Sequence, residues 1–154
     1  MNTILVAYFT KGGATKEYAQ TILDTLKEHN LSAELHNLAD GKPNIEAYDT
    51  IILGAGVRMF MVYRPMKKIL KQKEIKNKQL HLFLSAGMAV DEPKEAVEKF
   101  LKPLVEKYNV TPTSMISLPG KIPEKWVEKE SQKDPMKPDL AQKWAEEIIE
   151  HIKA

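Results

Sequence analysis

The stretch YFTKGGATKEY, from Tyr8 to Tyr18, places a pair of glycines between an apolar run and a helical pattern. The residues from Thr3 to Phe9, TILVAYF, are almost all apolar, which is typical of a strand whose sheet is covered by helices on both faces. After the glycines, apolar residues recur at helical spacing from Ala14 to His29, with charged residues between them. The sequence therefore predicts a buried strand, a short glycine turn and an amphipathic helix.

The same order of strand, loop and helix recurs along the chain. An edge strand and three buried strands are predicted from Ala33 to His36, Thr50 to Leu53, Leu80 to Leu84 and Ser114 to Leu118. Further helices are predicted from Pro65 to Gln72, Glu92 to Lys107 and Asp139 to Ile152. Such alternation indicates parallel βαβ units with right-handed crossovers. We predict an α/β fold in one domain, residues 1–154: a three-layer αβα sandwich around a five-stranded parallel sheet in the order 2-1-3-4-5.

Composition excludes several classes of function. The chain has 154 residues and a net charge of +2, from 23 basic and 21 acidic residues spread along it. Because no long block of one sign stands out, nucleic acid is not an expected partner. The chain has no cysteine and its four histidines lie in separate segments, so no metal site is predicted. We find no signal peptide and no apolar run of about 18 residues, and we expect a cytoplasmic protein without stable membrane insertion. The oligomeric state is left open.

The first loop, TKGGAT from Thr10 to Thr15, has the features of an anion-binding site. In sheets of this order, ligands bind beyond the carboxyl ends of the strands, where the strand order reverses. The glycines allow backbone N–H groups to point at a ligand, and the following helix begins with unpaired N–H donors and the positive end of its dipole. The sequence therefore predicts a phosphate site, with a plain connecting turn as the alternative.

Other phosphate motifs do not match. A Walker loop ends in Gly-Lys-Ser/Thr, whereas Thr15 precedes Lys16 here. A dinucleotide fingerprint needs a third glycine, which follows neither Gly12-Gly13 nor Gly54-Ala55-Gly56. A receiver domain would need an acidic residue at the end of the third strand, where Leu53 and Gly54 stand.

The first loop resembles the phosphate loop of the flavodoxin family, Ser/Thr-x-x-Gly-x-Thr, at Thr10, Gly13 and Thr15. The resemblance covers essentially the whole chain. More narrowly, residues 48–58, YDTIILGAGVR, with YFTKGGATKEYA before them, are similar to the subgroup that includes menaquinone-dependent protoporphyrinogen oxidase. Lys11 stands where that subgroup has a basic residue after the first threonine of the loop.

The resemblance implies that FMN is the cofactor. Its phosphate would lie on the first loop, and its ring between the loop from Ala55 to Phe60 and the loop from Ser85 to Val90. Gly56 would let the backbone approach the ring, and Arg58 would either stabilise the anionic reduced state or lie in solvent. Candidates to flank the ring are Met59, Phe60, Tyr63 and Met88. The residues predicted to bind FMN are Thr10, Lys11, Gly12, Gly13, Ala14, Thr15, Ala55, Gly56, Val57, Arg58, Met59, Phe60, Ser85, Ala86, Gly87 and Met88.

We therefore expect an FMN-dependent oxidoreductase that passes electrons between a reductant and a small acceptor such as a quinone or a tetrapyrrole. No catalytic residue is predicted. The alternative is an FMN electron shuttle that acts on a redox partner protein, and a third possibility is a scaffold that has lost the flavin. Carriers of this family are typically acidic, whereas this chain has a pI near 8.6. The segment from Pro119 to Pro138, with Trp126 and Val127 inward, is predicted to cover one side of the flavin cleft.

Overall fold

The computed structural model describes residues 3–11, 13–58, 61–120 and 136–153. Its centre is a sheet whose parallel strands lie in the order β2-β1-β3-β5-β6. These strands are β1 (Thr3–Phe9), β2 (Ser32–Asn37), β3 (Thr50–Arg58), β5 (Gln79–Ala86) and β6 (Ser114–Pro119). The predicted order 2-1-3-4-5 is confirmed. A sixth strand, β4 (Met61–Val62), was not predicted and pairs antiparallel with the end of β3.

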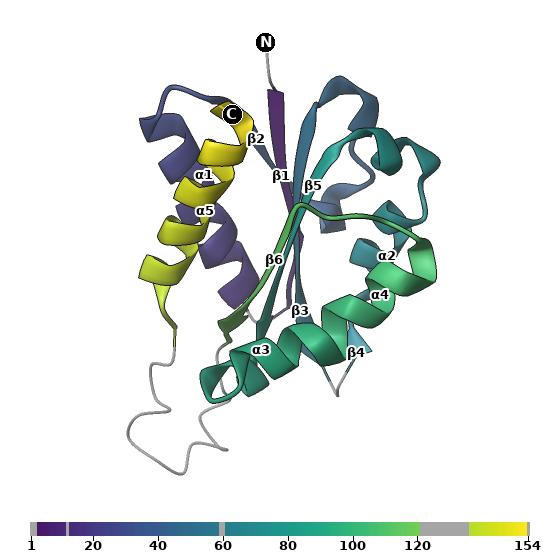
Figure 1. Ribbon diagram of the computed structural model, residues 1–154, viewed down its shortest axis with the longest axis vertical. Coiled ribbons are helices and arrows are strands. Elements are labelled where there is room, and N and C mark those ends of the chain that lie inside the picture. The colour runs from purple at the N-terminus through teal and green to yellow at the C-terminus, as the bar shows by residue number, and fades with distance from the viewer. Residues whose placement is uncertain (1–2, 12, 59–60, 121–135, 154) are drawn as a thin grey trace.

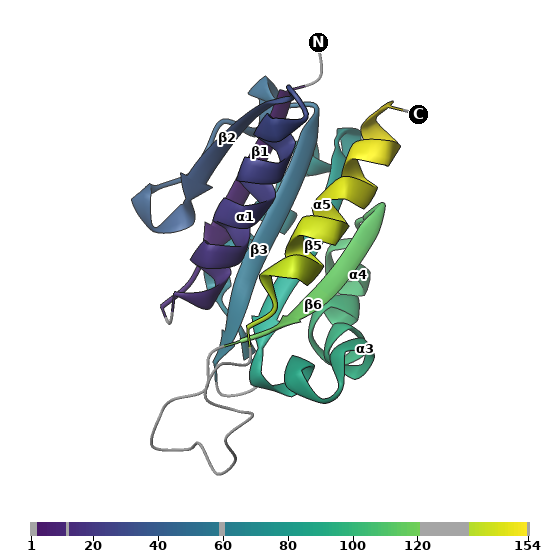
Figure 2. The same ribbon diagram turned by 90° about the vertical axis from the view of Figure 1, so that its left-hand side faces the viewer.

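Helices cover both faces of the sheet, which confirms the three-layer architecture (Figures 1 and 2). On one face lie α1 (Ala14–Glu28) and α5 (Pro138–Lys153), side by side. On the other face lie α2 (Arg64–Leu70), α3 (Pro93–Ala96) and α4 (Lys102–Tyr108). Short 3₁₀ helices at Leu38–Asp40, Ile45–Ala47, Lys73–Asn77 and Gly87–Val90 complete the connections.

The strand β1 shows why its sequence is apolar without interruption. Successive side chains of a strand point to opposite faces. Ile4 and Val6 enter the core beneath α1 and α5, whereas Leu5 and Ala7 enter the core beneath α2, α3 and α4. Every residue from Ile4 to Tyr8 is buried, so an alternating pattern would have placed polar groups inside one of the two cores.

The helix predicted from Glu92 to Lys107 is present from Pro93 to Tyr108, and it contains one π-helical turn that was not predicted. A π-helical turn, Val97–Leu101, separates α3 from α4. The cause is Pro103, which has no amide hydrogen and whose ring would collide in a regular α-helix with the carbonyl of Lys99. The wider turn allows the chain to continue past the proline in nearly the same direction.

The strand predicted to end at Leu53 continues to Arg58, so the loop predicted from Ala55 to Phe60 is largely strand. Val57 pairs with Val62 of β4, and residues 59–60 of this stretch lie outside the described part of the chain. Glycine here does not end the strand. A Cβ added to Gly54 would lie 2.0 Å from the ring of Phe83, its neighbour on β5, so Gly54 makes room for that ring.

Candidate functional site

Three of the predicted loops meet at the edge of the sheet where the parallel strands end (Figure 1). The strand register brings them together, because Phe9 pairs with Ala55 and Gly56 pairs with Ser85. The residues predicted to bind FMN therefore lie at one edge wherever the structure describes them. Gly12, Met59 and Phe60 belong to the same predicted set and lie outside the described residues.

The first loop ends in a helix start whose backbone donors have no side-chain cap. Gly13 is the N-cap of α1 and has φ of 90°, a left-handed conformation that favours glycine. The hydroxyl of Thr10 accepts a hydrogen bond from the Gly13 amide at 3.1 Å. The helical bonding begins with Glu17 N donating to Gly13 O, so the amides from Ala14 to Lys16 have no acceptor within the helix. These amides, at the positive end of a 15-residue helix, are the kind of donors that bind an anion.

Thr15 connects the first loop to the third. Its side chain is completely buried, and its hydroxyl oxygen lies 2.5 Å from that of Ser85, at the end of β5. Both residues belong to the predicted cofactor set. The two hydroxyls carry two hydrogens and the bond between them uses one, so one hydroxyl keeps a hydrogen to donate.

An aromatic side chain of the protein lies beside Gly56. A Cβ added to Gly56 would come within 3.3 Å of the ring of Tyr63 and 3.4 Å of the Thr15 hydroxyl. The Tyr63 ring meets the ring of Phe9 edge to face, with centroids 5.2 Å apart, and Lys11 Nζ lies 5.8 Å from its centroid. Tyr63 was considered only as a flanking candidate and is absent from the predicted binding set. Its contacts with residues far away in sequence place it at the site.

The third loop is held in place by the end of β6. Ser85 and Ala86 are buried at the end of β5, whereas Gly87 is exposed and Met88 is half-buried. Gly120 N donates to the carbonyl of Ala86 at 2.9 Å, and a Cβ added to Gly120 would lie 3.1 Å from Ala86 N. Glycine at this position lets the chain after β6 lie close to the backbone of Ala86, where an added Cβ would be tightly packed.

The charges at this edge differ from one loop to the next. Lys11 is exposed on the first loop, whereas Asp91, Glu92 and Glu95 follow the third. The pKa of Glu92 is raised, first because Glu95 hydrogen-bonds with its carboxyl group and then because Glu95 and Asp91 add negative charge nearby. An anion at this edge is therefore favoured at the first loop and disfavoured beyond the third.

Tyr18 ties the two flanks of residues 121–135 to α1. Its buried hydroxyl donates to the carbonyl of Pro119 at 2.5 Å and accepts from the amide of Lys137 at 3.0 Å. The predicted cover over the flavin cleft, including Trp126 and Val127, falls mainly on residues 121–135, outside the described residues.

The described residues contain no group of three or more side chains able to hold a metal ion. Nor do they form a helix that is both long and apolar enough to cross a membrane.

Solved structures share this fold over nearly the whole chain. Oxidised flavodoxin 1 from Bacillus cereus matches with a TM-score of 0.68 and 16% identity, covering 97% of this chain and 99% of that one. A mutant flavodoxin from Fusobacterium nucleatum, bound to flavin mononucleotide, matches with a TM-score of 0.61 and 17% identity over 97% of this chain and 94% of that one. Rubredoxin oxygen:oxidoreductase from Desulfovibrio gigas matches with a TM-score of 0.65 and 14% identity, covering 99% of this chain and 36% of that one.

No curated protein sequence matches the chain. The sequence profile described as the flavodoxin domain does, over residues 5–128, which is most of the chain. The profile includes β1, the first loop, the start of α1, and the ends of β3 and β5. The chain therefore belongs to the flavodoxin domain family.

Proposed function

We propose that this chain binds FMN and is an oxidoreductase that passes electrons between a reductant and a small acceptor. The observation that carries the proposal is the uncapped, left-handed Gly13 at the start of α1, at the edge where the three loops meet. Membership of the flavodoxin domain family makes FMN the expected cofactor.

The first loop would hold the phosphate. The amides from Ala14 to Lys16 point out of the start of α1, and each hydrogen bond to a charged group contributes about 1.5–3 kcal/mol. Lys11 adds a positive charge beside them. Three such bonds contribute about 4.5–9 kcal/mol before ordering costs are subtracted, against roughly 8 kcal/mol for micromolar affinity, so the loop contributes much of the expected affinity.

The second and third loops would hold the ring. The ends of β3 and β5 lie side by side through the pairing of Gly56 with Ser85, and Tyr63 adds an aromatic ring beside Gly56. An aromatic wall orients a flat ligand and excludes water from one of its sides. FMN, when bound, would supply the redox chemistry, and the protein would set its position and electrostatic surroundings.

The resemblance to the subgroup that includes protoporphyrinogen oxidase favours a quinone or a tetrapyrrole as the acceptor. The second candidate function is an electron shuttle that reduces a protein partner and does no substrate chemistry itself. Turnover of a soluble quinone by the isolated FMN-loaded protein would support the oxidoreductase. Electron transfer that occurs only with a partner protein would support the shuttle.

Binding of the phosphate is tested by titrating the protein with FMN and with riboflavin, following visible absorbance and thermal unfolding. We expect FMN to bind more tightly than riboflavin, and FMN at 100 times its Kd to stabilise the fold by about 2.7 kcal/mol. Gly13→Ala should weaken FMN binding by at least about tenfold, because alanine disfavours the left-handed conformation that shapes the loop.

The matched control is Gly41→Ala. Among the described residues, Gly41 is the other glycine with a positive φ, which is 116°. Gly41 is exposed and follows the 3₁₀ helix after β2, and its ψ of −176° makes the position at least as strained for alanine, so the variant should carry no less backbone strain and leave FMN affinity unchanged. Equal affinity for FMN and riboflavin would contradict the role of the first loop. Binding of neither compound would contradict the proposed function.

A further inference from the structure

The nearly balanced charge of the whole chain hides a strong local excess. Residues 64–78 contain seven basic residues and one acidic residue, whereas the rest of the chain contains sixteen basic and twenty acidic residues. The balance of positive and negative charge over the whole chain, on which the sequence prediction was based, does not reveal this segment. Its positive charge is concentrated on α2 and the 3₁₀ helix that follows, Lys73–Asn77.

Five of these basic side chains are exposed on two consecutive helices. Arg64 and Lys68 on α2 and Lys71 at its C-cap are four and three residues apart, and they share the face opposite the buried Met66 and Ile69. On the 3₁₀ helix, side chains three residues apart lie one above the other, which aligns Lys73 with Lys76. The set referred to below as the basic stripe is Arg64, Lys68, Lys71, Lys73 and Lys76, all of them exposed.

The basic stripe is not neutralised by the part of the chain that the structure describes. None of its five side chains forms an ion pair there, whereas nearby Lys78 lies 3.9 Å from Glu46. Unpaired charges of one sign on one surface create a potential that attracts partners of opposite charge and raises their rate of association by about 10–10³-fold.

The position of the stripe links it to the proposed FMN site. Arg64 follows Tyr63, which lies beside Gly56 at the carboxyl edge of the sheet. From there α2 and the 3₁₀ helix lead along one face of the sheet toward the start of β5, at the opposite edge (Figure 1). The stripe therefore begins at the cofactor edge and continues down the side of the molecule.

We propose that the basic stripe is the docking surface for an acidic redox protein that exchanges electrons with the proposed FMN site. This inference rests on the proposed function and names the partner of the same site. Opposite charges would steer the partner and fix its orientation, so that its own redox centre faces the carboxyl edge. Met61, with 63% of its surface exposed, lies at that edge and provides an apolar contact of the kind found at interface centres.

The geometry favours a protein over an anionic membrane or a nucleic acid. Seven α-helical and five 3₁₀ residues span about 20 Å, and charges are screened over about 8 Å at physiological salt. A bilayer in contact with the cofactor edge would therefore attract only the near end of the stripe. Residues 64–78 include no aromatic side chain on which a nucleic-acid base could stack. A protein can follow the whole stripe.

The test measures binding to an acidic plant-type [2Fe–2S] ferredoxin by calorimetry, with basic cytochrome c as the probe of opposite charge. The triple variant Lys68→Gln, Lys71→Gln, Lys73→Gln leaves the phosphate loop intact. We expect it to weaken ferredoxin binding at low salt by at least about fivefold, and we expect wild-type binding to weaken as salt is raised. The rate of electron exchange between the FMN-loaded protein and ferredoxin should fall in parallel, while its rate with a small uncharged quinone stays unchanged.

The matched control is Lys27→Gln, Lys143→Gln, Lys153→Gln, which removes the same charge from exposed positions on α1 and α5. It should change ferredoxin binding less than about twofold. Equal weakening by both triple variants would show that net charge alone matters and would overturn the proposal. Binding to phosphatidylserine vesicles but not to ferredoxin would also overturn it, in favour of a membrane. Failure of the proposed function would appear separately, as wild-type protein that takes up no FMN.

Discussion

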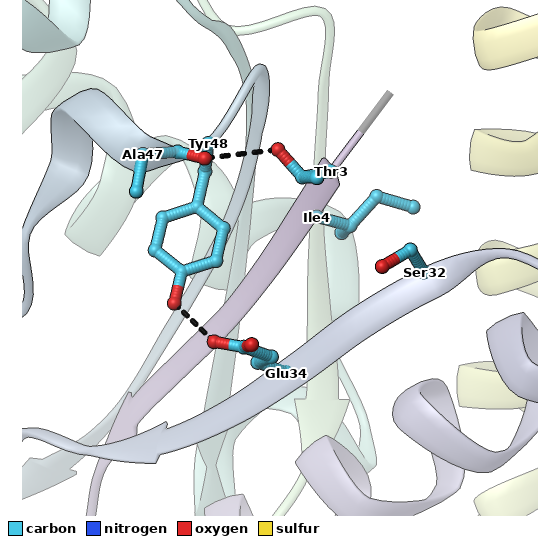
Figure 3. A pocket seen from close by; sticks show the side chains of 6 residues that line it. All are labelled: Thr3, Ile4, Ser32, Glu34, Ala47 and Tyr48. Atoms are coloured by element: carbon cyan, nitrogen blue, oxygen red, sulfur yellow. Dashed lines mark hydrogen bonds between the residues drawn. The ribbon is translucent and has the colours of Figure 1, made fainter. Parts of the chain in front are cut away.

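The two edges of the sheet differ in how far their polar groups are satisfied within the protein. At the amino edge, a pocket of about 150 Å³ is lined by Thr3, Ile4, Ser32, Glu34, Ala47 and Tyr48 (Figure 3). Three of its four polar side chains are already paired: Tyr48 donates from its hydroxyl to the carboxylate of Glu34, and Thr3 donates to the carbonyl of Ala47 at 3.0 Å.

The carboxyl edge has the opposite character. There the amides at the start of α1 have no acceptor within the helix, and Gly13 gives them no side-chain cap. A hollow lined mostly by paired groups offers a ligand little, whereas amides without an acceptor in the helix can gain a hydrogen bond when an anion arrives. The comparison favours the carboxyl edge, where these donors lie, as the edge of the proposed FMN site. Changes at the amino edge should then affect stability alone, and changes at the carboxyl edge should also affect FMN binding.

The largest effect is expected for acidification, through His81 in the amino half of β5. Its Nδ1 lies 2.6 Å from the Ser114 hydroxyl, its Nε2 lies 2.8 Å from Gln79 Oε1, and the side chain is completely buried. Burial, and then the nearby charge of His151, lower the pKa of His81 to about 4 from an ordinary value of 6.5. The unfolded chain therefore binds more protons between these two pH values, so stability is fully present above pH 6.5 and falls as the pH is lowered toward 4.

The His81 contribution to this loss is up to about 3 kcal/mol over the window, from 1.36 kcal/mol per pKa unit. Urea unfolding at a series of pH values, for the wild type and for His81→Gln, isolates it, because both proteins share all other titrating groups. Variant and wild type that lose stability equally on acidification would refute this account of His81. FMN affinity, compared at pH 7, should be the same in both proteins.

An intermediate effect is expected for Thr15→Val at the carboxyl edge. Removal of its hydroxyl leaves the buried Ser85 hydroxyl without its described partner, at a cost of about 1–3 kcal/mol in unfolding free energy. The double variant Thr15→Val, Ser85→Ala should recover much of this loss, because neither polar group is then left unpaired. We also expect a lower FMN affinity in Thr15→Val. An unchanged affinity would confine Thr15 to a structural role and weaken the contrast between the edges.

The smallest effect is expected for Tyr48→Phe in the amino-edge pocket. The hydrogen bond with Glu34, together with burial and the charge of Glu34, raises the pKa of Tyr48 to about 12. At pH 7 the substitution removes one exposed hydrogen bond and should reduce stability by less than about 1 kcal/mol. Denaturant unfolding measures this, and an alkaline absorbance titration should lose one late tyrosine ionisation. A change in FMN affinity would contradict the division between the two edges.

The strands were predictable because burial on both faces leaves a local mark. The apolar run from Thr3 to Phe9 indicates a buried strand. Tyr18, Ile22 and Leu26 of α1 are all completely buried, as their helical spacing indicates. The extension of β3 was not predictable in this way. Gly54 looks like a strand breaker in the sequence, and its reason for being glycine, the ring of Phe83, stands 29 positions away.

Only the part of the candidate site that is formed by residues close together in the sequence could be predicted. The loop from Thr10 to Thr15 has its glycines and its helix start within one stretch, so its chemistry follows from neighbouring residues. The bond between Thr15 and Ser85 joins residues 70 positions apart, and Tyr63 reaches the site through a strand that was not predicted. The basic residues of the stripe are visible in the sequence, but the net charge of the whole chain does not reveal them. Which of their side chains share a face depends on two helices with different numbers of residues per turn.

The hydroxyl of Tyr18 holds Pro119 and Lys137 together at the foot of α5. With both departure points fixed to one phenol, flexible residues inserted between them should destabilise the fold little, since each doubling of the length of a flexible loop costs only about 0.6 kcal/mol. This makes the junction a natural position at which to graft a peptide tag, a reporter or a longer recognition segment while the core stays as it is. Tyr18→Phe would loosen both anchor points at once and so reveal how much such grafts depend on them.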